Sequence, residues 1–454
     1  MKLAGLDIGT TTLCGLLLDS DTGEILSVVT EPNSFSIRGA GDWESLQDPD
    51  AICAVVGRIL GRLSGPHGRI GAIGVAGQMH GIIYVDAGGK ALSPLYTWQD
   101  GRGNREMRPG TTYAAALSRS MDRPVSTGMG AVTHFFNAAN GLVPADAVSM
   151  CTIADYAAMK LGGGTRPLMD TTNAASLACF DLRGLRFRPD VIEKAGMKPD
   201  IFPRVVTDYP TVGETKEGTP VFPALGDNQA SFLGSVAQVP GSILVNVGTA
   251  GQISVYLDHY VEISGIDTRP FPLGGYIAVG ASLCGGKAYS LLHGFFEQTV
   301  RLFTGGTSGA SWEIMNAVGP TAGSGDQLRV DTRFFGTRAA PETRGAITGI
   351  GPRNLTPERL IAGIREGIAE ELLGFLEDLP ADVRGSRKTL VGSGNGIRLN
   401  PELRRVFEAR LGMEMRVPSH REETSCGAAL LAGVAAGALP NLAAAGRLIR
   451  YLES

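Results

Sequence analysis

The sequence predicts an α/β protein made of two domains of related fold. Strand-like and helix-like segments alternate along the whole chain. In addition, a glycine-threonine turn between two apolar strands occurs once near the start and once near the middle. The chain has 454 residues, of which 43% are hydrophobic and 19% charged, so it is long enough for more than one domain and can bury real cores.

The first half opens with a predicted β-hairpin. Residues 7–19 read DIGTTTLCGLLLD, an apolar strand that turns at Gly9 and Thr10 into a second apolar strand. A helix is expected over 51–64, because apolar residues recur there on one helical face. A strand over 69–76, an apolar run over 82–85 and a helix over 155–161 follow.

The second half repeats this organisation. Residues 246–258 read NVGTAGQISVYLD, with Gly248 and Thr249 in the places of Gly9 and Thr10. Two copies this far apart predict two domains, with the boundary between residues 225 and 240.

Three further elements are expected near the C-terminal end. An amphipathic helix spans 357–379, and a short strand over 387–391 leads into a glycine-rich turn. A last helix takes Asn400 as its N-cap, Pro401 as its first residue and Gly412 as its end.

The composition excludes several classes of protein. The formal net charge is -4, without a basic stripe, which argues against nucleic acid as a partner. The six cysteines are scattered, as expected for free thiols in a reducing compartment, and the six histidines lack metal-ligand spacing. The N-terminus lacks the pattern of a signal peptide, and the most apolar late stretch, 428–439, is too short to span a bilayer. A cytoplasmic protein is expected.

The two glycine-threonine turns are candidate phosphate sites. Glycine lets backbone N–H groups approach a phosphate closely, and the hydroxyls of Thr10, Thr11 and Thr12 add donors. Asp7 could hold Mg²⁺ directly or through water, because Mg²⁺ prefers oxygen ligands. The alternative for one such turn is a tight hairpin with solvated threonines, but two turns can grip a polyphosphate from both sides.

A second glycine-rich segment, Gly392-Ser393-Gly394-Asn395, follows a strand and precedes a helix. Glycine-rich loops contact nucleotides in this context. The alternative is an ordinary strand-to-helix turn.

Asp227 is the candidate catalytic residue. It lies between the apolar run 221–225 and a predicted helix that begins near Ala230, so its carboxylate could point into a cleft and take a proton from a hydroxyl. The alternative role is an N-cap, and Asp170 has the same ambiguity.

Two polar clusters at strand ends could bind a polyol. Gln78, Met79 and His80 form the first, and Trp98, Gln99, Asp100 and Arg102 the second; together they offer donors, acceptors and an aromatic face. The alternatives are a structural histidine for His80 and a core aromatic for Trp98.

Seven segments in order resemble the FGGY carbohydrate kinases, which belong to the actin/hexokinase/Hsp70 superfamily. They are GLDIGTTT, GQMHG, TWQDGR, ALGDNQAS, NVGTAG, RGAITGI and LVGSGNG, and they span nearly the whole chain. The resemblance implies two ribonuclease-H-like domains flanking a catalytic cleft: a sugar-binding domain over 1–235 and an ATP-binding domain over 236–454. It also makes a homodimer plausible.

The resemblance implies a role for each matching residue. Asp227 matches the catalytic base, which also lies near the metal, and Asp7 matches the aspartate near Mg²⁺. The threonines at 10–12 and the Gly248-Thr249 pair match the phosphate-binding turns, and residues 392–395 match the adenosine loop. Gln78, Met79, His80, Asp100 and Asn228 match sugar-contacting positions.

Within the family, GQMHG is similar to the ketose kinases. TIADYAAMKLGG, RPLMDTTNAAS and VGSGNGIRLNPELRRVFE are similar to the branch that phosphorylates sedoheptulose. The family's Lys-x-Trp helix is missing around 127–137, near the substrate region. The alternatives are a xylulokinase or another pentulose kinase, and, outside the enzymes, a chaperone-like or switch ATPase of the same superfamily.

Overall fold

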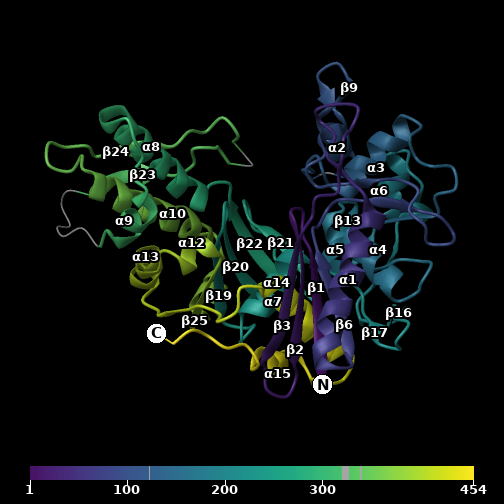
Figure 1. Cartoon of the computed structure of the whole chain (residues 1–454). Coiled ribbons are helices and arrows are strands. Elements are labelled where there is room, and N and C mark those ends of the chain that lie inside the picture. The colour runs from purple at the N-terminus through teal and green to yellow at the C-terminus, as the bar shows by residue number, and fades with distance from the viewer. Residues whose placement is uncertain (122, 320–326, 338–339, 454) are drawn as a thin grey trace. The chain divides into compact units, whose positions relative to one another are not determined.

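The computed structural model describes residues 1–121, 123–319, 327–337 and 340–453. The chain divides into two compact units. Unit 1 comprises 1–237, 269–276 and 422–449, and unit 2 comprises 238–268, 277–421 and 450–454. We describe each unit by itself, and Figure 1 labels the elements of both.

Unit 1 is built on a seven-stranded mixed sheet with the order β16-β17-β6-β1-β2-β3, in which β18 also pairs with β6. The strands β1, β2 and β3 are antiparallel neighbours, whereas β6 runs parallel to β1, β17 and β18. The bounds of these strands are β1 Lys2–Ile8, β2 Thr12–Asp19, β3 Ile25–Pro32, β6 Ala72–Gly77, β16 Gly213–Glu214, β17 Pro220–Val221 and β18 Leu225–Gly226.

Helices cover both faces of this sheet (Figure 1). On one face, α1 (Pro49–His67) packs on β2, where a Cβ atom at Gly15 would lie 2.3 Å from the Ile59 side chain. On the other, α14 (Glu423–Ala435) packs on β1 and β6 and against α7 (Asp227–Ser235). A Cβ atom at Gly5 would lie 1.8 Å from the Ser425 carbonyl oxygen, so only glycine lets the α14 backbone approach β1 this closely.

Helix α14 explains the apolar stretch in the sequence. From Ser425 to Gly433 its residues are small or apolar on every side and buried, because both the sheet and α7 enclose it. It is thus a core helix, and no helix in the described ranges is long and apolar enough to cross a membrane.

The rest of unit 1 consists of short elements beside the sheet. They are β4 Ser36–Ile37, β5 Leu46–Gln47, β7 Ile83–Val85, β8 Leu95–Tyr96, η1 Gly101–Asn104, β9 Glu106–Arg108, β10 Thr111–Thr112, α2 Tyr113–Met121, α3 Gly130–Ala139, β11 Ser149–Cys151, α4 Ile153–Leu161, β12 Leu168–Asp170, α5 Thr171–Ser176, β13 Phe180–Asp181, β14 Arg186–Phe187, α6 Pro189–Lys194, η2 Pro199–Ile201, β15 Arg204–Val206 and α15 Leu442–Gly446.

Unit 2 contains most of a six-stranded sheet with the order β21-β22-β20-β19-β25-β26, of which the end of β21 and the first residue of β22 are counted with unit 1. The hairpin β19–β20 is antiparallel, and β25 runs parallel to β19. The bounds are β19 Ser242–Val247, β20 Gly251–Leu257, β21 Asp267–Pro270, β22 Tyr276–Ser282, α8 Gly286–Thr304, α9 Ser311–Ala317, β23 Arg329–Asp331, β24 Ala346–Thr348, α10 Pro357–Glu377, α11 Ala381–Gly385, β25 Thr389–Ser393, α12 Asn395–Arg398, α13 Pro401–Leu411 and β26 Met415–Arg416.

Several local predictions are confirmed. Both glycine-threonine segments are the turns of antiparallel hairpins, and the expected helices over 51–64, 155–161 and 357–379 correspond to α1, α4 and α10. Asn400 caps α13 through the Leu403 N–H, and Gly412 ends that helix in the left-handed conformation. All six cysteines are free.

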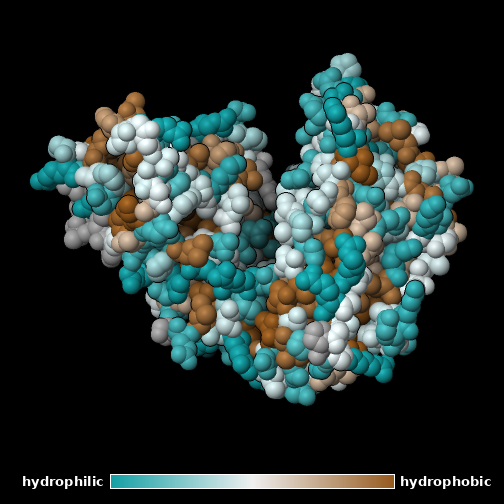
Figure 2. Space-filling model, viewed as in Figure 1, coloured by the Kyte–Doolittle hydropathy of each residue, from teal (hydrophilic) through white to brown (hydrophobic). Residues whose placement is uncertain are grey.

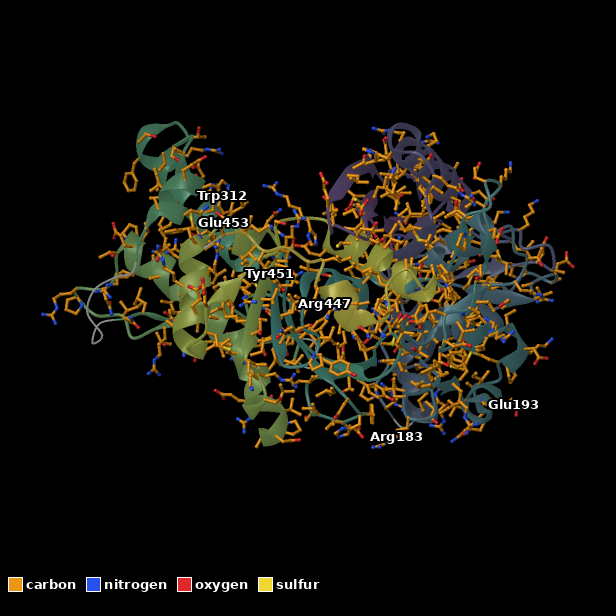
Figure 3. All side chains as sticks on the ribbon, turned by 90° about the horizontal axis from the view of Figure 1, so that it is seen from below. Arg183, Glu193, Trp312, Arg447, Tyr451 and Glu453 are labelled. Carbon is orange, nitrogen blue, oxygen red and sulfur yellow. The ribbon has the colours of Figure 1, made fainter. Side chains whose placement is uncertain are left out.

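The chain passes from unit 1 to unit 2 after Ala237 and then returns twice. The second return, 422–449, contributes α14 and α15 to unit 1, and residues 450–454 end in unit 2. Arg447 and Tyr451, labelled in Figure 3, stand on either side of this last crossing. Figure 2 shows hydrophilic and hydrophobic residues interspersed over the surface of each unit.

Candidate active site

Three predicted residues of unit 1 lie at neighbouring strand ends. Asp7 pairs with Ala76 near the ends of the parallel strands β1 and β6, and the Gln78 N–H donates to the Ile8 carbonyl. On the other side of β6, Gly226 pairs with Gly77 and is followed at once by Asp227. Carboxyl ends of parallel strands are where α/β folds place ligands, so the fold gathers Asp7, Gln78 and Asp227 at such an edge.

The first glycine-threonine turn lies at the same edge and presents free backbone amides. Side chains behind the turn hold its carbonyl groups: Asn33 Nδ2 donates to the Gly9 oxygen at 2.9 Å, and Gln47 Nε2 to the Thr10 oxygen at 2.9 Å. Within the described residues, the N–H groups of Thr10 and Thr11 have no hydrogen-bond partner. Adjacent unpaired N–H groups are the donors that a phosphate oxygen requires.

Asp7 and Asp227 form a buried carboxylate pair in which both pKa values are raised. Burial, and then the negative charges of Asp227 and Glu422, raise the pKa of Asp7 from 3.8 to about 8. Burial raises the pKa of Asp227 to about 6, although the Asn228 N–H and the Arg269 charge oppose that rise. Asp227 is therefore largely ionised at neutral pH and still basic enough to accept a proton.

Asp227 and Asp170 differ although their sequence contexts look alike. Asp170 is the N-cap of α5 and accepts from the Thr172 N–H at 2.8 Å. Asp227 is the first residue of α7, Gly226 is the N-cap, and no side chain caps that helix. The N-cap interpretation therefore holds for Asp170 and not for Asp227.

The first polyol cluster joins the phosphate turn through hydrogen bonds. Gln78 is buried; its Oε1 accepts from Thr10 Oγ1 at 3.4 Å, and its Nε2 donates to Gln47 Oε1 at 3.0 Å. The Trp98 indole N–H donates to Thr10 Oγ1 at 2.9 Å. Trp98 is 45% exposed, so it is not a core aromatic and presents its ring to solvent.

The neighbouring residues of this cluster are held by the backbone around them. His80 Nδ1 lies 2.7 Å from the Ser176 carbonyl, so Nδ1 carries the proton in that bond. Met79 is buried, and its Sδ would lie 2.6 Å from a Cβ atom at Gly226. Met79 thus packs against the residue that precedes Asp227.

Asp100 is engaged entirely within the protein. It is fully buried and caps η1 through the Arg102 N–H; Oδ1 also accepts from Arg102 Nε at 2.6 Å, and Oδ2 from the Ser45 N–H at 3.1 Å. The Arg102 guanidinium is buried too and lies 4.0 Å from the centroid of the Tyr96 ring. In this conformation Asp100 fixes the loop after Trp98.

The second glycine-threonine turn, in unit 2, has the same hydrogen-bond pattern as the first turn. The carbonyl groups of Gly248 and Thr249 accept from the first N–H groups of α8, Gly286 N at 2.8 Å and Lys287 N at 3.0 Å. In the described part of the chain, the N–H groups of Thr249 and Ala250 have no partner. In this turn, too, the carbonyl groups accept hydrogen bonds from the protein while adjacent N–H groups are left available to a phosphate.

The glycine-rich loop lies beside this turn at the end of β19. Ser393 pairs with Asn246 in parallel register, and a Cβ atom at Gly394 would lie 2.6 Å from the Val247 oxygen. Gly394 has φ 81°, which favours glycine. Ser393 is buried, and its Oγ has no partner among the residues described. Gly248, Thr249 and residues 392–395 are thus neighbours in space.

Sequence reasoning missed the charged neighbours of the carboxylate pair and the start of α8. Glu422 precedes α14 and accepts from Cys14 Sγ at 3.4 Å, and the Arg269 guanidinium donates to Asn228 Oδ1 at 3.4 Å. Both come from segments that return to unit 1, so no local pattern marks them. The sequence did carry signals for α8, namely the Gly285-Gly286-Lys287 run after an apolar strand, the amphipathic pattern over 286–304 and Gly305 at its end.

The donor set fits a Mg²⁺ ion that keeps most of its waters. Asp7 Oδ1 is buried and has no hydrogen-bond partner within the described ranges. Those ranges contain no cluster of three or more His, Cys, Asp or Glu side chains suited to a metal. One or two carboxylates, completed by water and phosphate oxygens, are the usual protein ligands of Mg²⁺.

A cavity of about 790 Å³ lies elsewhere in unit 2, and none of the predicted site residues lines it. Its walls come from α13, β26 and the C-terminal tail, which includes Tyr451 and Glu453 (Figure 3). It plays no part in the site described above.

Comparison with known proteins gives a consistent result. Residues 3–234 match the N-terminal domain, and residues 275–436 the C-terminal domain, of the FGGY family of carbohydrate kinases. A sedoheptulokinase from Mus musculus is 27% identical over 89% of this chain and 91% of its own length.

Solved structures share the fold. A xylulose kinase from Rhodospirillum rubrum superposes with a TM-score of 0.85 at 21% identity, covering 100% of this chain and 93% of that one. A Plasmodium falciparum glycerol kinase with ADP gives a TM-score of 0.80 at 17% identity, covering 100% and 93%. The chain therefore shares its fold with these two sugar and glycerol kinases.

Proposed function

This chain belongs to the FGGY family of carbohydrate kinases and is thus a phosphotransferase, and from that premise we propose that Asp227 is its catalytic base. The reaction would move the γ-phosphoryl group of ATP to a primary hydroxyl of a ketose. One observation carries the proposal: Asp227 follows a strand end directly, has a pKa of about 6 and interacts with Asp7 next to open turn amides.

The residues divide the chemistry between them. Asp227 accepts the proton of the sugar hydroxyl as that oxygen attacks phosphorus, while the N–H groups of Thr10 and Thr11 donate to phosphate oxygens. Mg²⁺, when bound, offsets the charge on those oxygens, and Asp7 would hold its water shell. Catalysis of this kind is mostly positioning plus electrostatic stabilisation, which suits the fixed turn and strand ends.

We assign the sugar to the N-terminal domain over 1–235 and the nucleotide to the C-terminal domain over 236–454. The first assignment is supported by Gln78, His80, Trp98 and Asn228, which offer donors, acceptors and an exposed ring. Asp100 would act through Arg102 and the loop rather than by contact. The assignment of the nucleotide to the C-terminal domain is supported by the Gly248-Thr249 turn and the neighbouring loop 392–395. The turn would bind phosphate, and the loop would bind adenosine.

Sedoheptulose is the proposed acceptor, forming sedoheptulose 7-phosphate, because the mouse relative carries that activity in its name. Pentulose kinase is the second candidate, favoured by the xylulose kinase structures. Family resemblance also supports a homodimer in the cytoplasm.

A panel of acceptors should separate these candidates. We expect sugar-dependent ADP release with sedoheptulose at a kcat/KM at least about tenfold above that with xylulose, ribulose, fructose or glycerol, since a site that pairs the extra hydroxyls leaves none of its own groups unpaired. The measurement is a coupled ADP assay. A higher kcat/KM for xylulose would assign a pentulose kinase, and ATP binding without ADP release for any sugar would indicate a switch ATPase.

Arg269 should tune the base. Its positive charge lowers the pKa of Asp227, so Arg269→Met should raise that pKa and move the acidic limb of kcat/KM upward from about pH 6 by roughly 0.5–1 unit. Arg269→Lys keeps the charge and serves as the control, with a limb near the wild-type position. A limb that stays in place in the Met variant would show that Arg269 does not act on Asp227.

A further inference from the structure

The backbone just before Asp227 makes only short sheet pairings. Strand β18 consists of two residues, Leu225 and Gly226, which pair with the end of β6. On the opposite side, Ala224 forms a single parallel bridge with Met169 of β12. A two-residue strand cannot by itself fix the direction of the side chain that follows it. On the β12 side the backbone bridge ends at Ala224, so side-chain hydrogen bonds carry the support onward to Gly226, the residue before Asp227.

Two adjacent side chains of α5 supply those hydrogen bonds. Thr172 Oγ1 accepts from the Gly226 N–H at 2.9 Å, and Asn173 Nδ2 donates to the Ala224 carbonyl at 3.1 Å. Thr172 and Asn173 are both fully buried. They thus hold one donor and one acceptor of the backbone on either side of Leu225.

Thr172 and Asn173 are themselves anchored by buried carboxylates. Asp170, at the end of β12, accepts from the Thr172 N–H at 2.8 Å, and Asp155 Oδ1 accepts from Asn173 Nδ2 at 3.2 Å. Asp155 in turn closes the capping box of α4 with Thr152. The two side chains therefore belong to a rigid frame and have little freedom to follow a displaced β18.

Helix α7 is held just as closely on its other side. A Cβ atom at Gly427 of α14 would lie 1.9 Å from the Ala230 carbonyl, and one at Gly234 would lie 1.8 Å from the Glu423 carbonyl. The helix that begins with Asp227 is thus fixed along its length by α14. Its first residue depends on what holds Gly226.

We infer that Thr172 and Asn173 are positioning residues for phosphoryl transfer, which set the place of Asp227 by holding the backbone on both sides of Leu225; the inference rests on the proposed role of Asp227 as base. Both side chains act through the backbone and not by contact with the reacting atoms. Removing the Thr172 hydroxyl leaves the buried Gly226 N–H unpaired, so the backbone shifts to find another acceptor.

The test compares Thr172→Val with Thr172→Ser. Valine has the shape of threonine without the hydroxyl, so we expect kcat to fall about 10- to 100-fold with the KM for the sugar changed less than about threefold, because displacing a reacting group by an ångström costs on this order. Serine restores the acceptor and should restore kcat to within about threefold. Asn173→Ala, which removes the second hydrogen bond and needs no extra room, should lower kcat in the same way.

Thr219→Val is the matched control. Thr219 is also buried and donates to the Ile70 carbonyl at 3.2 Å, but it lies at the opposite end of the same sheet, before β17. The Thr219→Val variant should have a lowered melting temperature, as Thr172→Val should, but it should keep the wild-type kcat. A folded Thr172→Val or Asn173→Ala enzyme with unchanged kcat, or an equal loss of kcat in Thr219→Val, would overturn the inference.

Asp227→Asn, assayed in parallel, separates the two proposals. An inactive Asp227→Asn enzyme together with a fully active Thr172→Val enzyme would remove only the positioning role. An active Asp227→Asn enzyme would remove the base itself and with it the reason for positioning.

Discussion

Replacing Asp227 with asparagine should lower kcat by a factor on the order of 10²–10⁴, the contribution typical of a positioned general base. Asparagine preserves the shape of the side chain but cannot accept the proton of the sugar hydroxyl. Asparagine is also compatible with the first turn of α7, and it relieves the repulsion that Asp227 exerts on Asp7. The KM for ATP should therefore change by less than about threefold, as measured by steady-state ADP release and by direct nucleotide binding.

Asp19→Asn provides the comparison. Asp19 undergoes the same chemical change at the far end of β2, where it accepts from the N–H groups of Asp21 and Thr22. Asparagine can accept both bonds, so this variant should retain wild-type kcat. Turnover within about tenfold of wild type in a folded Asp227→Asn enzyme would rule out Asp227 as the base.

Replacing Asp7 with asparagine should stabilise the fold while it impairs catalysis. The folded protein keeps a proton on Asp7 up to about pH 8, whereas the unfolded chain loses it near pH 3.8. Folding therefore takes up a proton between these values, and the stability of the wild type falls as pH rises through this window. The asparagine side chain does not titrate, so the stability advantage of Asp7→Asn should grow from pH 5 to pH 8 and reach roughly 1–3 kcal/mol in urea unfolding.

The same substitution should remove the proton release that accompanies metal binding. Holding a Mg²⁺ ion requires Asp7 in its ionised form, so wild-type enzyme should release close to one proton below pH 8 when Mg²⁺ and nucleotide bind. Calorimetry in buffers of different ionisation enthalpy measures that release. Asp7→Asn should release none and lose roughly 10- to 100-fold in Mg²⁺-dependent turnover. Equal proton release in both enzymes would separate Asp7 from the metal.

Features that depend on neighbouring residues could be predicted from the sequence. Each hairpin needs only two apolar strands and a glycine at the turn, and the ends of α13 need only Asn400 and Gly412. The strand ends that carry Gln78 and Asp227 follow from the same local patterns. These signals identified the elements and placed the candidate residues at their ends.

The roles of Asp170 and Asp227 could not be told apart in this way. Both follow a short strand and precede a helix, and the difference is whether the aspartate is the N-cap or the first helical residue. That one-residue difference depends on where β18 pairs with β6 and on the hydrogen bond from the Gly226 N–H to Thr172. The partner lies 54 positions away in the chain, outside any local pattern.

The rest of the candidate site depends on long-range packing and could not be predicted from local sequence patterns. Helix α14 is apolar on all sides, so its sequence has no periodicity that would show which surfaces it covers. Glu422 enters the site only because α14 returns to β1, and Arg269 only because the segment 269–276 returns to unit 1. Both charges act on the carboxylate pair, and neither could be assigned to it from its neighbours in the sequence.

The late return of 422–449 also governs how this protein can form in the cell. Gly5 and Gly74 lie in contact with the backbone of α14, so that face of the unit 1 sheet has no such cover until residues 423–435 have been synthesised. A nascent chain of the first 237 residues carries one uncovered apolar face of this sheet for that time, the condition under which chaperones are engaged. Unit 1 therefore cannot complete its packing before α14 has been made, and a premature stop before Glu422 would release a chain in which the α14 face of the sheet and the adjoining side of α7 stay uncovered.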